Sequence, residues 1–473
     1  MRDDFDLVVL GAGPAGEKGA AQAAYFGKRV AVVEASRDPG GIAVSTAGIP
    51  TKALRESALH LTGLGQSPGD LAGRGPILDR LMEKKAEAVS VMTHAVRRNL
   101  TRHRVELIQG RARLLPGRAV EVTLPTGGRR VLTGNAILVA TGGRPVRPAW
   151  LPAGDPGVRD SGNILDIGSL PKSLLVLGEG AVGCEYASIF AALGVKVTLL
   201  CREDRVLPSM DVEASRVLAE SFNGLGIRVL PSAEVTSVVR TGDALVATLR
   251  NGKTVEAEMV FAALGRRAAT EGLGLEDAGV ALTDGGHVLV DERFETTASG
   301  VYAAGDLIGT PGLAALAMEE ARVAVCHAFG FGYKQRVDGL CPTYVFSIPE
   351  VASVGMTEEA AKAAGVDYEV GRTAFATNAK ARLSGFYDGF VKLVFRADDQ
   401  VLLGVHIVGE QASELIHLGQ FVLHDGGTLS RFIQATFAVP TRSEAFKYAA
   451  YDGLMRLSRR AEKKAAAAAT ARG

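Results

Sequence analysis

The chain has 473 residues, enough for about three domains at roughly 150 residues each. Its 53 lysines and arginines balance 52 acidic residues, so we expect neither a nucleic-acid partner nor an anionic membrane surface. No stretch approaches the ~18 apolar residues of a membrane span, and four scattered cysteines suit neither a disulfide scaffold nor a metal site, so the sequence predicts a cytoplasmic protein without bound metal. The 57 glycines are typical of nucleotide-binding α/β proteins.

Two stretches of the chain repeat one order of apolar strand, glycine-rich turn, helix and second strand. They are DLVVLGAGPAGEKGAAQAAYFGKRVAVVE, residues 6–34, and SLLVLGEGAVGCEYASIFAALGVKVTLLC, residues 173–201. The GxGxxG glycines of the first copy are Gly11, Gly13 and Gly16. Their counterparts, each 167 residues further along, are Gly178, Gly180 and Gly183.

Each glycine of this motif meets a physical demand of dinucleotide binding. The first forms the turn, the second lets backbone approach a pyrophosphate, and the third allows a helix to pack closely on its strand. The diphosphate then lies at the helix N-terminus, formed here by Pro14 and Ala15 in one copy and by Ala181 and Val182 in the other. We therefore expect two Rossmann-like dinucleotide-binding units in an α/β protein.

Further elements follow the repeats in chain order. A buried-type strand in 136–148 ends at Thr141-Gly142, where the chain should leave the first unit, and residues 260–267, with Gly265, should return it. Residues 296–306 end in Gly305-Asp306, an acid placed either to accept from a sugar hydroxyl or to form a turn. From 337 the alternating strands and later helices predict an α+β module, and 461–473 is expected to be a disordered or frayed tail.

Taken together, these motifs resemble the flavoprotein disulfide reductase family. Within it, segments such as IPTKALR, GCEYASIFAALGVKV and ATFAVPTRSEAF resemble the soluble, Si-specific pyridine nucleotide transhydrogenases. The resemblance implies an FAD domain at 1–150 and 277–336, an NAD(P) domain at 151–276 and a dimerisation domain at 337–460. It also implies a homodimer formed through that last domain.

The chain departs from this family where thiol chemistry takes place. The positions that match the family's redox cysteine pair are Ala43 and Gly48, and the position of its catalytic histidine is Val439, although Glu444 is kept. Thiol–disulfide exchange needs a thiolate and a base for its proton. The sequence therefore argues against disulfide reduction.

The resemblance assigns the remaining catalytic residues and the contacts of the two cofactors. Lys52 matches the lysine beside flavin N5 and Glu185 its ion-pair partner, although Lys52 could instead be a solvated helix lysine. The implied FAD contacts are Gly11, Gly13, Pro14, Ala15, Gly16, Glu34, Gly41, Lys52, Ala112, Thr141, Gly142, Asp306 and Ala314. The implied NAD(P) contacts are Gly178, Gly180, Ala181, Val182, Gly183, Glu185, Cys201, Arg202, Val235 and Gly265.

The repeat also indicates which coenzyme the second site accepts. Glu34 ends the second strand of the first copy and should accept from ribose hydroxyls, whereas Cys201 is its counterpart. Without an acid there, NADPH should be accepted, with Arg202 placed to pair with its 2′-phosphate. Glu203 and Asp204 could bind ribose or merely balance charge, so NADH is not excluded.

Three functions fit this pattern. The first is an FAD-dependent transhydrogenase that moves hydride from NADPH through flavin N5 to NAD+. The second is an NAD(P)H:quinone or diaphorase-type reductase, because Ala43 and Gly48 could leave room for a flat acceptor. The third is a redox-silent FAD protein that acts as a scaffold, which would have no need of Lys52 and Glu185.

Overall fold

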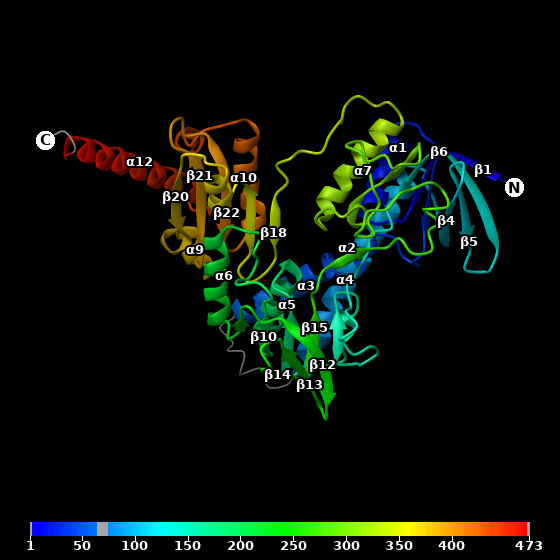
Figure 1. Ribbon diagram of the computed structural model, residues 1–473, viewed down its shortest axis with the longest axis horizontal. Helices are drawn as coiled ribbons and strands as arrows, with labels where there is room; N and C mark the ends of the chain where they lie inside the picture. The colour runs from blue at the N-terminus through cyan, green and yellow to red at the C-terminus, as the bar shows by residue number, and fades with distance from the viewer. Residues whose placement is uncertain (1, 64–73, 471–473) are drawn as a thin grey trace.

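The computed structural model describes residues 2–63 and 74–470, which form three units (Figure 1). The first unit lies at the right in Figure 1, the second, in green, at the bottom, and the third, in orange and red, at the left. The expected α/β fold with two Rossmann-like units and a C-terminal α+β unit is confirmed. The residue limits expected for the domains stay predictions.

The first unit is a seven-stranded sheet covered by helices. Its strand order is β3-β2-β1-β6-β5-β4, and β17 pairs in parallel with the end of β6. The strands are β1 (Arg2–Leu10), β2 (Val30–Glu34), β3 (Glu106–Gln109), β4 (Arg111–Leu115), β5 (Ala119–Thr123), β6 (Arg129–Val139) and β17 (Val301–Ala303). The helices are α1 (Pro14–Tyr25), α2 (Gly41–Ser45), α3 (Ile49–Gly63), α4 (Arg74–Arg102), η3 (Gly305–Ile308) and α7 (Ala314–Ala328).

The second half of strand β1, Leu7–Leu10, shows why its sequence is an apolar run. Leu7 and Val9 pack into the core beneath α1 and α7, whereas Val8 and Leu10 pack into a second core on the opposite face. Since the sheet is covered on both faces here, none of these four positions faces solvent, and all four are apolar.

The second unit repeats this architecture with a five-stranded parallel sheet, in the order β11-β10-β9-β15-β8. Its strands are β8 (Val158–Asp160), β9 (Ser173–Leu177), β10 (Lys196–Leu200), β11 (Arg228–Leu230) and β15 (Met259–Ala262), and its helices are η2 (Ile164–Asp166), α5 (Ala181–Ala192) and α6 (Val212–Gly224). An antiparallel sheet of β12 (Val235–Thr241), β13 (Ala244–Leu249) and β14 (Thr254–Ala257) packs beside it. The two connections to the first unit pair with each other as β7 (Gly143–Pro145) and β16 (Arg266–Ala268).

The third unit is a five-stranded antiparallel sheet with helices. Its order is β18-β19-β22-β21-β20, formed by β18 (Thr343–Val345), β19 (Val351–Gly355), β20 (Tyr368–Ala374), β21 (Phe390–Arg396) and β22 (Leu402–Val408). The helices are α8 (Glu358–Ala363), η4 (Phe375–Thr377), α9 (Ala379–Ser384), α10 (Ala412–His424), α11 (Ser430–Gln434) and α12 (Ala445–Thr470).

Residues 461–470 lie in the segment expected to be a frayed helix or a disordered tail. They continue α12 as a helix that projects away from the third unit, and 471–473 lie outside the described residues (Figure 1). The run of alanines explains the helix, because alanine has the highest intrinsic helix propensity. No helix in the described ranges is long and apolar enough to cross a lipid bilayer.

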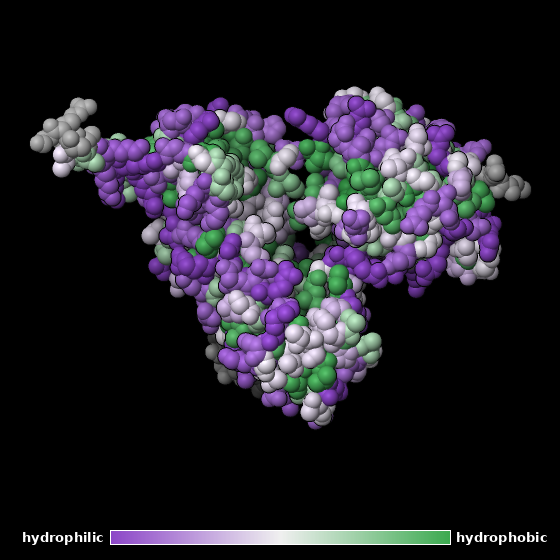
Figure 2. Space-filling model, in the orientation of Figure 1, coloured by the Kyte–Doolittle hydropathy of each residue, from purple (hydrophilic) through white to green (hydrophobic). Residues whose placement is uncertain are grey.

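Large apolar side chains are exposed on the third unit, where Figure 2 shows apolar residues among polar ones. They are Leu383, Tyr387, Leu418, Phe421, Val439, Tyr448, Tyr451 and Met455. Phe421 and Val439 are 72% and 73% exposed. A surface of this kind is typical of a protein interface.

A buried cation joins the third unit to the second. Lys392, on β21, is 1% exposed, and its ammonium lies 3.0 Å from the carboxylate of Asp211. The same carboxylate accepts from the backbone nitrogens of Glu213 and Ala214 at the start of α6. Glu358 forms a further ion pair with Lys392. The second unit is therefore anchored to the C-terminal sheet by a charge that has no access to water.

We predict that Lys392→Met destabilises the protein by about 3–5 kcal/mol, because it leaves the buried Asp211 carboxylate without its cation. The measurement is urea denaturation followed by circular dichroism. Arg250→Met is the matched control, since it removes a cation whose pair with Glu234 is exposed, and it should leave the midpoint nearly unchanged. Equal effects of the two substitutions would contradict the role of Lys392.

Candidate dinucleotide-binding sites

The two glycine turns have almost the same conformation. Gly11 has φ of +100° and Gly178 of +116°, values that favour glycine over residues with a side chain. A Cβ on Gly16 would lie 1.8 Å from the carbonyl oxygen of Gly11, and one on Gly183 would lie 1.9 Å from that of Gly178. The third glycine is therefore required for the helix to pack this closely on its turn in both copies.

The helices after these turns begin without a side-chain cap. Gly13 precedes α1 and Gly180 precedes α5, and neither helix start has a side-chain acceptor, whereas the side chain of Asp211 caps α6. A Cβ on Gly180 would meet nothing within 4 Å, so the space in front of α5 is open. Free N–H groups at a helix start suit an anion. Those of Ala181 and Val182 fit the diphosphate of NAD(P), and that of Ala15 fits the diphosphate of FAD, since Pro14 has no N–H.

Glu34, at the end of β2, places a carboxylate beside the first turn. In the second unit the corresponding position is Cys201, which has no carboxylate. Glu34 accepts hydrogen bonds from the backbone nitrogens of Ala12 at 2.7 Å and Ser36 at 2.8 Å. The Glu34 carbonyl oxygen accepts a hydrogen bond from the backbone nitrogen of Gly110. The expected FAD contact Ala112 lies two residues further along, on the neighbouring β4. Cys201, the counterpart of Glu34, is buried, and its thiol pKa is raised to about 12 by burial and secondarily by Glu179.

Asp306 meets a partner that the sequence did not indicate. Its carboxylate accepts from Arg266 Nε at 2.8 Å, and the same guanidinium donates to the carbonyl oxygen of Gly143. The Thr141 hydroxyl donates to Ala269, and Gly142 has φ of +69°. Arg266 therefore connects the carboxylate of Asp306 in η3 with Gly143, the residue directly after Thr141-Gly142.

Helix α7 supplies a second residue that sequence reasoning missed. Ala314, one of the expected FAD contacts, is its first residue. Two turns further on, the buried Glu320 accepts from the backbone nitrogen of Gly305 at 2.7 Å, and burial raises its pKa. No motif marks Glu320, because its partner is a backbone group on another element.

Lys52 and Glu185 come together from the two units. Lys52 Nζ on α3 lies 2.9 Å from Glu185 Oε2 on α5, and Glu185 Oε1 accepts from the backbone nitrogen of Phe346 at 2.9 Å. The Lys52 ammonium also lies 4.6 Å from the centre of the Phe346 ring. The expected ion pair is present, and its carboxylate is buried. Lys52 is therefore held in one direction by its partner, with its side chain 29% exposed.

The positions that match the redox cysteines lie against each other. A Cβ on Gly48 would fall 2.3 Å from the carbonyl oxygen of Ala43 and 2.9 Å from its Cα. Of the free cysteines, Cys184, Cys201 and Cys326 are buried and Cys341 is half-buried. Burial raises the pKa of the Cys184 and Cys341 thiols, as it does for Cys201.

The remaining residues expected at the NAD(P) site lie near the ends of the second sheet. Gly265 follows β15 with φ of +90°, and Val235 begins β12 beside the core that contains Leu200. The guanidinium of Arg202 is exposed and pairs with Glu203 at 3.0 Å.

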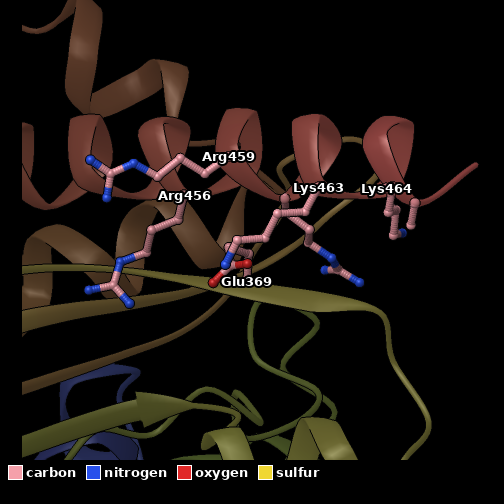
Figure 3. Close-up of a pocket in the computed structure, with 7 residues that line it drawn as sticks. Glu369, Arg456, Arg459, Lys463 and Lys464 are labelled. Carbon is pink, nitrogen blue, oxygen red and sulfur yellow. The ribbon is translucent and has the colours of Figure 1, made fainter. Parts of the chain in front are cut away.

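Two other features of the third unit lie outside these sites. Glu444 is buried and accepts from Asn378 Nδ2 at 3.2 Å, so it holds α9 against the segment before α12. A basic groove along α12 is shown in Figure 3, and its lining residues are Glu369, Arg456, Arg459, Arg460, Lys463, Lys464 and Ala467. We assign it no part in nucleotide binding, because α12 lies at the far end of the third unit (Figure 1).

No group of three or more His, Cys, Asp or Glu in the described part of the chain could hold a metal ion.

Comparison with known families gives two matches that together cover most of the chain. Residues 5–321 match the family described as pyridine nucleotide-disulphide oxidoreductase, and residues 341–450 match its dimerisation domain. The second match supports the formation of a homodimer.

Individual relatives and solved structures agree with the family matches. The soluble pyridine nucleotide transhydrogenase of Mycobacterium bovis BCG is 39% identical, over 95% of this chain and 97% of the relative. The protein of the same name from Pseudomonas fluorescens is 37% identical, over 96% of this chain and 99% of the relative. The crystal structure of LpdA from Mycobacterium tuberculosis is similar with a TM-score of 0.86, 30% identity and coverage of 95% and 99%. The HOCl-induced flavoprotein disulfide reductase of Escherichia coli, solved as a Cu(II) complex, is similar with a TM-score of 0.87 and 27% identity. The match covers 95% of this chain and 99% of that structure.

We predict that Glu34→Ala weakens FAD binding by roughly 10- to 150-fold, the equivalent of a charge-assisted hydrogen bond of about 1.5–3 kcal/mol. Flavin released on dilution, followed by fluorescence, measures this change. Glu106→Ala, on the neighbouring β3, removes an exposed carboxylate and is the control. Colourless wild-type protein that stays colourless after FAD addition would contradict the assignment of the first site.

Proposed function

Because the chain belongs to the pyridine nucleotide-disulphide oxidoreductase family, we propose that it is an FAD-dependent transhydrogenase acting between NADP(H) and NAD(H). Relatives named soluble pyridine nucleotide transhydrogenase, at 37% and 39% identity over nearly the whole chain, support this proposal. When bound, FAD would supply a hydride acceptor and donor at N5. One nicotinamide site used in turn by both coenzymes implies ping-pong kinetics.

The ion pair between Lys52 and Glu185 is the observation that carries the proposal. Lys52 lies on α3 of the first unit, and Glu185 lies two residues beyond the last glycine of the second glycine turn. The pair therefore joins a helix of the first unit to the helix that follows the second turn. A fixed cation there favours negative charge on a neighbouring flavin ring. A scaffold that bound FAD without chemistry would not need it.

A thiol route for electrons lacks support in this chain. The positions of the family's cysteine pair are Ala43 and Gly48, and Val439, at the position of the histidine, carries no base. The pKa values of Cys184, Cys201 and Cys341 are raised, so these thiols are poor sources of thiolate. Hydride would therefore pass directly between nicotinamide and flavin.

The quinone reductase alternative depended on free space beside Ala43 and Gly48. Since a Cβ on Gly48 would meet the backbone of Ala43, that position is already filled by main chain. No contact in the described residues favours a flat acceptor there. We therefore retain the transhydrogenase as the proposal.

We predict that the FAD-loaded protein couples NADPH oxidation to thio-NAD+ reduction faster than to naphthoquinone reduction. In an anaerobic titration, NADPH should deliver two electrons per FAD without a long-wavelength thiolate band, because no cysteine pair can take two more. Alkylation of the buried thiols under native conditions should leave the rate nearly unchanged. A faster naphthoquinone rate, or uptake of four electrons per FAD, would contradict the proposal.

We predict that Lys52→Ala lowers kcat by roughly 10- to 150-fold, as expected for the loss of a charge-assisted contact of about 1.5–3 kcal/mol. Stopped-flow reduction by NADPH measures this effect apart from product release. The control is Lys84→Ala, which removes an exposed ammonium that pairs with Glu87 on α4. An unchanged rate in Lys52→Ala would show that the cation does not act on the flavin.

A further inference from the structure

The two dinucleotide sites carry their acidic residue at exchanged positions. In the first copy the strand-end residue is Glu34, and the middle residue of the turn is Ala12. In the second copy, 167 residues further along, the strand-end residue is Cys201 and the turn carries Glu179. Each copy therefore has one carboxylate and one small side chain at these two positions, in opposite order.

The two carboxylates bridge the same gap from opposite sides. Glu34 reaches from the end of β2 to the turn, where its Oε2 accepts from the backbone nitrogen of Ala12 at 2.7 Å. Glu179 reaches from the turn to the end of β10, where its Oε2 accepts from the backbone nitrogen of Arg202 at 2.9 Å. Both hydrogen bonds connect the turn with the end of the second strand. An acid thus occupies this gap in both units.

Contacts of the main chain hold Glu179 in this place. Its carbonyl oxygen accepts from the backbone nitrogen of Leu207 at 2.9 Å and from the thiol of Cys184 at 3.3 Å. Its charge is also a secondary cause, after burial, of the raised pKa of the Cys201 thiol. Within the described residues, its Oε1 accepts no hydrogen bond, so one oxygen is open to a ligand.

We propose that Glu179 determines coenzyme choice at the second site by accepting from the ribose 2′-hydroxyl of NAD(H) and repelling the 2′-phosphate of NADP(H). A strand-end acid performs this role in NAD-binding Rossmann units, and here the turn supplies it. The expectation drawn from Cys201, that nothing at the site repels a 2′-phosphate, is thereby reversed. Arg202 supplies the opposing attraction, since its guanidinium is exposed and forms an ion pair with its exposed neighbour Glu203.

This inference rests on the proposed function in that both coenzymes use the second site. It is tested by calorimetry on the full-length, FAD-loaded protein with ADP-ribose and 2′-phospho-ADP-ribose, which carry no nicotinamide. The wild type should bind ADP-ribose more tightly. In Glu179→Gln, which keeps an oxygen for the Arg202 N–H but loses the charge, the affinity ratio should move toward 2′-phospho-ADP-ribose by roughly 10-fold or more.

Two further variants define the result. Glu179→Ala, which recreates the turn of the first copy, should move the ratio in the same direction. Glu220→Gln, an exposed acid on α6 that pairs with Arg216, should not move it. An unchanged ratio in both Glu179 variants, tighter wild-type binding of 2′-phospho-ADP-ribose, or no binding of either compound would overturn the inference. A shifted ratio without NADPH-to-thio-NAD+ activity would support it while contradicting the transhydrogenase proposal.

Discussion

Three units of the chain meet at the carboxylate of Glu185. It receives the ammonium of Lys52 from the first unit and the backbone N–H of Phe346, directly after β18, from the third. One turn later, the Ser188 hydroxyl accepts from the backbone nitrogen of Ile348. Because a buried carboxylate is costly without its donors, these contacts fix helix α5 against both neighbours. The direction of Lys52, and with it the junction of the two dinucleotide sites, depends on this one side chain.

Buried charges determine how the units are oriented, whereas apolar burial supplies most of the cohesion. The largest described core combines side chains of α3, α5 and α6 with residues of β18, β21 and β22. Across the same junction, Arg55 is 1% exposed and pairs with Glu350 at 3.2 Å and Glu410 at 2.7 Å. Apolar contacts tolerate small displacements, but a buried ion pair that separates leaves uncompensated charge. Such pairs therefore select one arrangement among several that bury similar area.

Sequence patterns predicted the structure correctly where the local backbone conformation requires one residue type. The positive φ of Gly11 and Gly178 and the close packing at Gly16 and Gly183 follow from the spacing of the glycines alone. Arg266 and Glu320 were missed because their partners, Asp306 and the backbone of Gly305, lie on other elements. The alanine-rich segment to Thr470 continues α12 as a helix, in agreement with the high helix propensity of alanine.

The sequence by itself determined the two repeated units, the loss of the cysteine pair and histidine, and the residues of the ion pair. The tertiary structure decided which side chains fill equivalent places. In the aligned repeats, Cys201 corresponds to Glu34, so the sequence predicted no acid at the end of that strand in the second site. In the folded chain, Glu179 instead reaches from the turn to the strand end, as Glu34 reaches from the strand end to the turn. The physical reason is that glycine and strand patterns record constraints within a few residues, whereas the position of a carboxylate is set by whichever segments fold around it.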